Sequence, residues 1–433
     1  MLRKLTFVWL LVALFMSVLA KPLLAAEQGD SITDWTFSGH SKFQYIHTRI
    51  PDDSVLQDIS GDSLQDFNLE VRLQAAARRN RWGFMADLQF ITVHSDKLSA
   101  SDDLPLLLFP GADVINDDRR WFNLTHVFHN EGKNATLARL DRISIGYTGD
   151  KTVIRFGRQA VSWGNGLLYT PMDIFNPFDP ATVDKEFKSG DDMLYGQYLL
   201  DDGSDIQTVA VVRRDLISGD VEADQSSLAV KYHGFGQGFV GGYEYDLLLA
   251  EHYDDLVVGL GGSADIAGAV WRGDLVWTDT DTSSVLTAMA GSSYSWVTGQ
   301  RNWTGVLEYY YNGYGQSGGD YSAQGLANNP ALLQRLARGE IFNLGRHYLG
   351  AGATVEISPL FILGPNIFVN LTDPSALAQL VMTYDWKQDL QVLAALNVPI
   401  GSKGSEYRGI EVQQPGLYIS TGPSIFAQLA WYF

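Results

Sequence analysis

Apolar and polar side chains alternate with a period of two over long stretches of this chain. Between Phe67 and Ala75 every second residue is apolar, and the residues between them are Asn, Glu, Arg and Gln. Successive side chains of a β-strand point to opposite faces, so such a segment predicts a strand with one oily face and one polar face. The same alternation recurs around Trp35, Tyr243, Trp271, Val355 and Leu390.

The length of the alternating segments separates two kinds of β-protein. Strands of soluble domains average about five or six residues, whereas many segments here run for about 9 to 13 residues, which is the length that crosses a bilayer at a tilt. Aromatic residues lie near the segment ends, as a membrane-interface belt requires. No apolar run beyond the N-terminal segment approaches the roughly 18 residues of a spanning helix. We therefore expect an all-β fold, a transmembrane antiparallel up-and-down β-barrel.

The periodicity predicts about 18 strands. Connections after even-numbered strands are short, and those after odd-numbered strands include the long segments 95–135, 162–191, 313–345 and 400–421. Short periplasmic turns and long extracellular loops are typical of outer-membrane barrels, and an even strand count places both termini in the periplasm. The predicted strands are 35–48, 64–77, 82–94, 136–148, 151–161, 192–200, 205–214, 225–234, 238–250, 255–263, 267–277, 284–297, 301–312, 346–357, 360–371, 376–385, 389–399 and 422–433.

Three features qualify this segmentation. The two faces are poorly separated in 136–148, 192–200 and 205–214. Residues 330–339 (PALLQRLARG) predict a short helix within a long loop. Residues 104–110 (LPLLLFP) are unusually apolar for a surface loop and are expected against the barrel mouth or its rim.

The first 26 residues predict a secretory signal peptide. Two basic residues precede an almost unbroken apolar run from Leu5 to Leu19, which at roughly 15 residues is short for a spanning helix. Small residues allow cleavage after Ala20 or after Ala26, and cleavage after Ala26 is favoured because a polar stretch follows. An uncleaved membrane anchor is the alternative. Residues 27–433 then form a single barrel domain.

Charge and cysteine content narrow the class of protein further. Residues 1–26 hold three basic residues and no acidic one, so their removal takes the formal net charge from −19 to −22. Such an acidic chain lacks the clustered basic residues that a nucleic-acid-binding protein needs. With no Cys it has neither a disulfide nor a thiolate metal site, and no motif points to a cofactor. We expect a Gram-negative outer-membrane protein whose partners are membrane lipid and the barrel-assembly machinery; a periplasmic export partner stays open.

The chain ends on one more alternating segment. Leu429, Trp431 and Phe433 share a face with Ile425 and Ala427. A terminal Phe that closes an alternating strand resembles the C-terminal signal read by the bacterial barrel-assembly machinery. We assign Leu429, Trp431 and Phe433 to that assembly signal, and an ordinary last strand is the alternative.

The most distinctive segment begins as a strand at Ile154 and becomes a long loop rich in Gly, Pro, Asn and aromatic residues. Part of it resembles a motif of outer-membrane barrels related to the alginate-export type and of a larger porin-like family. The resemblance covers about a tenth of the chain; it implies a barrel of about 18 strands that moves polar or anionic solutes, and it does not imply alginate as the substrate. The matching residues are Gly157-Arg158-Gln159, Trp163-Gly164 and Asn176-Pro177.

A barrel of about 16 to 18 strands leaves an aqueous channel unless it is plugged, and loop 162–191 is long enough to fold inward and narrow it. Such a constriction loop is either a packed plug or part of a binding site. Strand phase puts Arg155, Gly157 and Gln159 toward the lumen, whereas Arg158 falls on the lipid phase unless the strand bulges.

Strand phase also identifies charged residues that face the lumen. They either line a solute track or neutralise one another in a ladder that supports the wall. The candidates for the solute path are Arg72, Arg142, Arg155, Gln159, Arg272, Glu70, Glu244, Asp246, Asp274, Glu308 and Glu356.

The expected function is a passive outer-membrane channel for diffusion or export of polar or anionic solutes, saccharides among them. A plugged structural barrel or a surface adhesin without an open pore is the alternative. Catalysis is not expected, since His252 with Asp254 and Asp255 in one surface turn is the nearest approach to a hydrolytic set. The acidic pairs Asp191–Asp192 and Asp279 with Asp281 suit soluble loops as well as a divalent cation, and no metal site is assigned.

Overall fold

The computed structural model describes residues 34–100, 116–238, 241–412 and 414–433. The expected signal peptide and the apolar segment 104–110 lie outside these residues. No helix among the described residues is long and apolar enough to cross a membrane.

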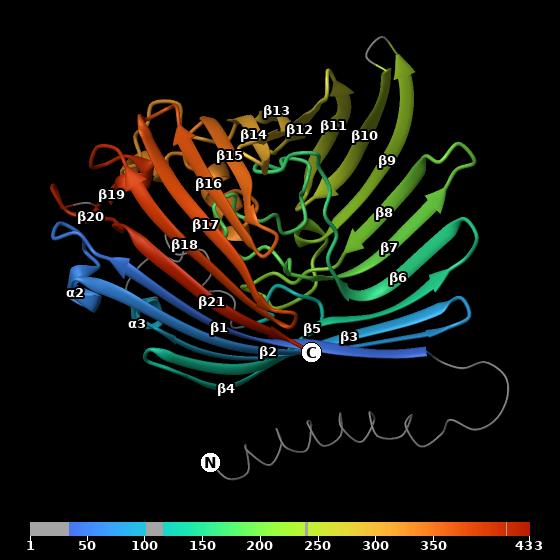
Figure 1. Ribbon diagram of the computed structural model, residues 1–433, viewed down its shortest axis with the longest axis horizontal. Helices are drawn as coiled ribbons and strands as arrows, with labels where there is room; N and C mark the ends of the chain where they lie inside the picture. Colours follow the sequence, from blue (N-terminus) through green and yellow to red (C-terminus); the bar gives the residue numbers. More distant parts are fainter. Residues whose placement is uncertain (1–33, 101–115, 239–240, 413) are drawn as a thin grey trace.

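Eighteen strands form one closed antiparallel ring (Figure 1). Neighbours in the ring are consecutive along the chain, and β21 pairs with both β18 and β1. The expected barrel and its strand number are confirmed. The ring consists of β1 (Asp34–Arg49), β2 (Ser63–Arg79), β3 (Trp82–Ser95), β5 (Asn134–Thr148), β6 (Thr152–Gln159), β7 (Asp191–Leu199), β8 (Asp205–Val211), β9 (Ser227–Gly238), β10 (Gly241–His252), β11 (Asp255–Ile266), β12 (Ala269–Asp279), β13 (Ser284–Thr298), β14 (Arg301–Asn312), β15 (His347–Ser358), β16 (Phe361–Asn370), β17 (Ser375–Lys387), β18 (Leu390–Ile400) and β21 (Ser424–Tyr432).

The remaining elements lie in the long connections. Figure 1 places α2, α3, β19 and β20 together at the left, which is the long-loop end of the barrel. The N-terminal end of β1 and the C-terminal end of β21 lie at the opposite, short-turn end of the barrel, because each strand joins a long loop at its other end. These elements are α2 (Gln57–Ser60), α3 (Asp96–Ala100), β4 (Thr125–Glu131), η4 (Ala223–Gln225), α4 (Ala323–Ala327), α5 (Pro330–Arg338), η5 (Glu406–Arg408), β19 (Ile410–Glu411) and β20 (Tyr418–Ile419).

The predicted helix in a long loop is confirmed as α5. The Asn329 side chain accepts a hydrogen bond from the Leu332 backbone N–H, and Pro330 occupies the first turn, where its missing N–H costs nothing. Gly339 ends the helix in the left-handed conformation, with φ of 68°.

Two segments expected to be loops contain strands. β4 lies in 95–135 and pairs with β5 alone among the described strands, and β19 pairs with β20 inside 400–421. Neither segment alternates in hydrophobicity. Pairing with a neighbour, which period-two analysis does not detect, is what makes these residues strands.

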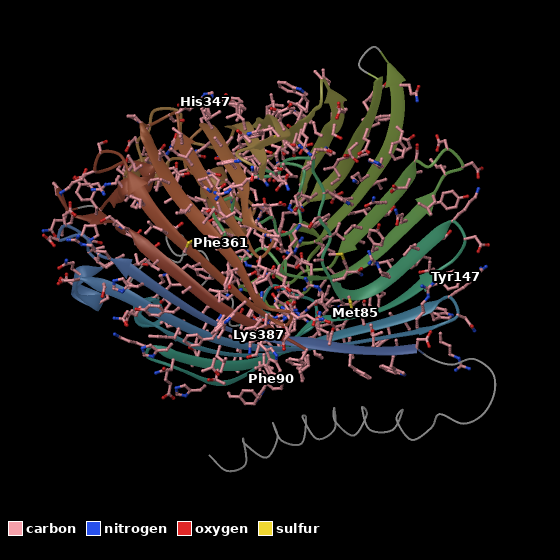
Figure 2. The ribbon with its side chains drawn as sticks, viewed as in Figure 1. Met85, Phe90, Tyr147, His347, Phe361 and Lys387 are labelled. Carbon is pink, nitrogen blue, oxygen red and sulfur yellow. The ribbon has the colours of Figure 1, made fainter. Side chains whose placement is uncertain are left out.

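The outer surface of the ring is apolar and the inner surface is polar, as the alternation predicts. On β10, Leu247 is 47% exposed and Leu249 57% exposed, whereas Asp246, which precedes Leu247 and lies on the opposite face, is 4% exposed. Phe90, labelled in Figure 2, projects from the outer surface below β3. So large an exposed apolar area is stable against lipid and not against water.

Tryptophans ring the outer surface near the short turns. Trp296 and Trp303 stack across the β13–β14 hairpin with ring centroids 6.0 Å apart. Trp82 begins β3 just after a turn, and Trp386 lies one residue from the end of β17. Their amphipathic rings suit the level of the lipid headgroups, so this belt marks one boundary of the membrane.

The β9–β10 hairpin is longer than the sequence predicts. β9 continues to Gly238, four residues beyond the expected end, and pairs with β10 throughout. Glycine carries no side chain, so the alternation of apolar and polar side chains stops near Gly234, although the strand continues to Gly238. Rings of the opposite strand take the space: an added Cβ on Gly236 would lie 2.3 Å from the ring of Tyr243.

The last strand closes the ring at the short-turn end. β21 pairs with β1 from His40–Tyr432 to Thr48–Ser424, and the Phe433 N–H donates to the Gly39 carbonyl at 3.0 Å. Leu429, Trp431 and Phe433 all face outward and are 40%, 49% and 51% exposed.

One part of the wall is built from a loop. On the N-terminal side of Ile143, β5 pairs with β4 in place of β6. The chain before β4 runs beside β7 and β8. Arg158, fully buried on the outward phase, joins these pieces: its Nε donates to Asp192 at 2.8 Å and its Nη1 to Asp117 at 3.1 Å. Its Nη2 also donates to the Phe122 carbonyl at 2.6 Å. Burial raises the pKa of Asp117, but Arg158 and Arg120 outweigh burial and hold that pKa at about 2.

Removal of the Arg158 side chain is expected to destabilise the barrel strongly. Arg158→Ala leaves buried Asp192 without its cation and removes one cation from Asp117, which keeps Arg120; this costs about 3–5 kcal/mol of unfolding free energy. Urea unfolding of the vesicle-folded protein, followed by circular dichroism, measures the loss. The control is Arg81→Ala, whose pair with Asp150 is exposed on both sides and should give no measurable loss. Equal stability of the two variants would contradict a role for Arg158 in the wall.

Candidate functional site

Loop 160–190, which joins β6 to β7, lies inside the barrel. Figure 1 shows this green segment within the ring. Trp163, Met172 and Phe175 are at most 4% exposed, and the Trp163 Nε1 donates to Gln207 at 2.8 Å. They pack on lumen-facing apolar residues of β7 to β12, namely Met193, Tyr195, Val209, Val211, Ala229, Leu248, Ala250, Val257 and Val276.

A second apolar contact holds the middle of the loop. Tyr169 is 2% exposed and stacks on Tyr310 of β14, with ring centroids 4.9 Å apart and an interplanar angle of 11°. Met289 of β13, Tyr348 of β15 and Phe368 of β16 belong to the same cluster, with Tyr407 of loop 401–423 at its edge. The loop therefore reaches from the β7–β12 side of the lumen to the β14–β16 side.

Three lumen carboxylates bind the loop between these contacts. Glu308 accepts hydrogen bonds from the backbone N–H groups of residues 167, 168 and 169 at 2.6, 2.9 and 2.9 Å. Asp274 accepts from both the backbone and the side-chain amide of Asn165, and Asp246 accepts from the same amide at 3.2 Å. Buried backbone donors need such partners, so these predicted solute contacts are anchors of the loop.

Charged groups hold the far limb of the loop, residues 176–188. Lys42 on β1 lies 2.7 Å from carboxylate oxygens of both Asp184 and Glu186. Lys188 donates to Asp173 at 2.6 Å. Burial raises the pKa of Asp173 to about 6, against the opposing effect of Lys188.

Two further lumen candidates are occupied by structural contacts. Arg72 is 2% exposed; its Nη1 lies 2.7 Å from Asp141 and its Nε 3.3 Å from Glu70. Its guanidinium also covers the ring of Phe187, 4.0 Å from the centroid. Arg142 donates to Asp141 and to the Lys188 carbonyl. These residues form the wall ladder, one of the two roles that strand phase left open.

The other lumen candidates lie toward the short-turn end. Arg155 lies over the Tyr195 ring at 4.5 Å, and Arg272 donates to the Ser293 hydroxyl at 2.8 Å. Glu244 is exposed, and exposed Glu356 accepts from Asn302 at 2.6 Å. None of these four has an opposite charge as partner among the described side chains, so they are the charges that a solute in this half of the lumen would meet. Gln159 is buried and donates weakly to backbone carbonyls.

The Gly-Arg-Gln and Trp-Gly residues shape the start of the loop. Gly157 has φ of 125°, and an added Cβ would lie 2.1 Å from the Ile143 carbonyl oxygen, so only glycine fits. Gly164 and Asn176 also have positive φ, of 98° and 52°. Arg158, as described, belongs to the wall and not to the lumen, although it lies beside this kink.

Sequence analysis missed the apolar lumen residues that receive the loop. They lie where both phases of a strand are apolar, as in Val209 to Val212 and Leu247 to Ala250. Such continuous runs indicate strands buried on both faces. That signal was present in the sequence and indicates a lumen filled by protein at this level.

Glu406 of loop 401–423 links this loop to loop 313–346. Its carboxylate accepts from the Leu344 backbone N–H at 2.8 Å, from the Tyr348 hydroxyl at 2.5 Å and from the Asn370 amide at 2.6 Å. No cation lies among these partners. Burial raises the pKa of Glu406 to about 7, against these hydrogen bonds.

The surface turn considered for hydrolysis is part of a buried network. His252 is 1% exposed; its Nδ1 lies 2.9 Å from Ser227 Oγ and its Nε2 3.4 Å from Glu340. Asp255 pairs with Arg335 at 2.6 Å. Asp191 and Asp192 pair with Arg213 and Arg158. Within the described part of the chain, no group of three or more His, Cys, Asp or Glu side chains is placed to hold a metal ion.

No protein-family model matches this sequence, and no curated protein matches it significantly. Solved structures share its fold. The outer membrane protein OpdK of Pseudomonas aeruginosa superposes with a TM-score of 0.52 and 8% identity, over 92% of this chain and 98% of that chain. OccAB4 of Acinetobacter baumannii gives 0.51 and 8%, over 93% and 98%. A double variant of OccD1 (OprD) gives 0.51 and 9%, over 94% and 97%.

Identity this low establishes a shared fold and nothing narrower. The chain has the closed antiparallel β-barrel fold of these structures, as the sequence predicts. None of these three structures is named as an alginate exporter, so the narrower tie indicated by the Gly-Arg-Gln motif stays a prediction.

Weakening the Glu308 anchor is expected to loosen the loop. Glu308→Gln replaces one carboxylate oxygen, which accepts hydrogen bonds, by an amide NH₂ group, which cannot accept them from the backbone N–H groups of the loop. The lost hydrogen bonds cost about 1–3 kcal/mol. Hydrogen exchange at residues 164–170 should accelerate, and single-channel current should become noisier. Glu356→Gln is the matched control, because that lumen carboxylate holds a single side chain and no loop. Unchanged exchange in Glu308→Gln would contradict the anchor.

Raising the pH is expected to loosen loop 401–423. A carboxyl whose folded pKa is raised stabilises the docked loop fully below its ordinary value of 4.5, and that stability is lost as the pH rises through about 7. The change amounts to about 3 kcal/mol. The hydrogen-exchange rate of residues 402–410, corrected for the intrinsic rate, should increase from about pH 5 to about pH 8, a range that spans this pKa. Glu406→Gln should remove the dependence; a dependence that persists in this variant would assign it to another group.

Proposed function

We propose that this protein is a passive channel of the bacterial outer membrane for small polar solutes. The observation that carries the proposal is a closed 18-strand ring, apolar outside and polar inside, whose lumen is crossed by its own loop 160–190. A ring of this size leaves more space than one loop fills. A loop anchored at mid-height narrows such a lumen and makes it selective for size and polarity.

Localisation and assembly follow from the same architecture. The short-turn end, which carries both described chain ends, is proposed to face the periplasm, and the long loops the exterior. Outward-facing Leu429, Trp431 and Phe433 are available to the barrel-assembly machinery before closure. An export partner in the periplasm and cleavage after Ala26 remain predictions. The shared fold with an outer membrane protein supports the location, and the protein is proposed to have no enzymatic activity.

The charges that face the lumen favour polar solutes over strongly charged ones. Most of the lumen cations are neutralised, as for Arg72, Lys42 and Lys188. Arg155 and Arg272 have no carboxylate partner among the described side chains, and Glu244 and Glu356 lie in the same half. Lys185 of loop 160–190 is also exposed and donates to the Pro180 carbonyl, with no ion pair to a carboxylate in the described part of the chain. The anionic preference implied by the resemblance to alginate-export barrels is thus supported by these three cations.

A plugged structural barrel is the second candidate, and one observation favours it. Loop 160–190 contacts the wall on the β7–β12 side, the β14–β16 side and, through Lys42, the β1 side. A loop that seals the lumen at all three places would leave a barrel without conductance, with function confined to the extracellular loops.

Conductance in planar bilayers separates the two candidates. We expect ion current through the refolded protein, and a higher current when residues 176–187 are replaced by a short Gly-Ser linker. This variant removes the limb that crosses to β1 and keeps Trp163, Met172 and Phe175 on the wall. Its folding is checked by circular dichroism. Absence of current in both folded proteins would refute the channel and favour the plugged barrel.

A further inference from the structure

A recess opens on the lumen face of β9 to β12, the strands at the upper right of Figure 1, close to their short turns. It measures about 570 Å³, which is within the range of small-molecule pockets. Phe235 and Glu244, which pair across β9 and β10, both line it. Asp246, which binds Asn165 of loop 160–190, is two residues from Glu244 on the same face. The recess therefore adjoins the constriction on its short-turn side.

A half-exposed aromatic ring lines one side of the recess. Phe235 is on the same face of β9 as Lys231 and His233, and both of these contact Asp246 inside the lumen. Phe235 is nevertheless 50% exposed, and beside it an added Cβ on Gly242 would meet nothing within 4 Å. An aromatic ring on this face meets water and not lipid, so a flat apolar group that covers it is stabilised.

Three polar side chains of the recess bond to none of the described residues. They are the Gln237 amide, the Glu244 carboxylate and the Ser263 hydroxyl. The amide and the hydroxyl donate and accept hydrogen bonds, whereas the carboxylate only accepts them. An ammonium group cannot accept from Gln237, and a carboxylate group cannot donate to Glu244. A ligand with several hydroxyls both donates and accepts, so it can bond all three side chains.

Charges of both signs flank the recess. Glu244 and Arg272 lie in the same cross-strand row, separated by Ser263 on β11. Asp265, the second carboxylate of the lining, accepts from the Gly268 backbone N–H of its own turn at 3.2 Å. An anion in the recess is repelled by Glu244 and a cation by Arg272. An uncharged ligand meets neither repulsion.

We propose that this recess binds an uncharged, hydroxyl-bearing ring, the chemistry of a neutral saccharide, on the short-turn side of loop 160–190. The inference rests on the proposed channel function and names a class of solute for it. Phe235 would contact the apolar face of the ring. Gln237, Glu244 and Ser263 would bond its hydroxyls.

The probes are D-glucose, D-glucosamine and D-glucuronate, which share one pyranose ring and are neutral, cationic and anionic. Saturation-transfer NMR titration of the full barrel, folded in a detergent without a sugar headgroup, measures binding without requiring an open pore. We expect glucose to bind most tightly. The cationic and the anionic sugar should each bind at least several-fold more weakly.

Two variants test the contacts themselves. Gln237→Leu keeps the approximate size and removes the amide, and it should weaken glucose binding about threefold to tenfold. Phe235→Ala removes the ring and should weaken binding at least as much. Gln391→Leu is the matched control, because this amide on β18 donates to Asp385 at 2.9 Å outside the recess. Circular dichroism checks that each variant is folded.

Equal losses in Gln237→Leu and Gln391→Leu, unchanged binding in Phe235→Ala, tighter binding of either charged sugar, or no binding of glucose would each overturn the proposal. A protein that conducts ions and does not bind glucose refutes this site and leaves the channel intact. A protein that binds glucose without conducting supports the site and refutes the channel.

Discussion

Every other feature of this protein depends on closure of the hydrogen-bonded ring. In lipid a strand cannot leave its backbone groups unpaired, so a membrane-spanning sheet must have no edge. The pairing of β21 with β1 removes the last edge, and this in turn fixes which phase of every strand meets lipid. Where β5 parts from β6, the same requirement is met by β4 and the chain before it, held by buried Arg158. A buried ion cluster thus holds the wall together where the regular hydrogen-bond ladder between strands is interrupted.

The ring was predictable because its signal is local. Alternation within each segment reports lipid on one side, and that contact is a property of nine or ten neighbouring residues. Tyr245 and Leu247, on either side of buried Asp246, show this pattern. Loop 160–190 adds contacts that the period does not encode. Its packing makes the lumen phase of β7 and β8 apolar, as at Val209 and Val211, and this is why the two faces of these strands are poorly separated in the sequence.

The roles of the lumen residues were less predictable than their positions. Glu308 faces the lumen as expected, but its partners are backbone groups about 140 residues earlier in the chain. Asp274 is likewise held by Asn165. No spacing rule connects such residues, so a carboxylate that anchors a loop and one that meets a solute look alike in sequence. Strand phase alone therefore identifies which residues face the lumen, and the fold of the loop decides which of those residues a solute can reach.

The loop is held in two physically different ways. Trp163 and Phe175 bury apolar surface against β7 to β12, a contact that salt does not screen. The limb from residue 176 to 188 depends instead on the pairs of Lys42 with Asp184 and Glu186, of which Glu186 is 35% exposed. The pair with Glu186 reaches solvent and is weakened by ions, whereas the pair with Asp184, which is 19% exposed, is screened less. One half of the loop is therefore part of the barrel core, and the other half is held partly by a contact that the ionic strength of the medium can weaken.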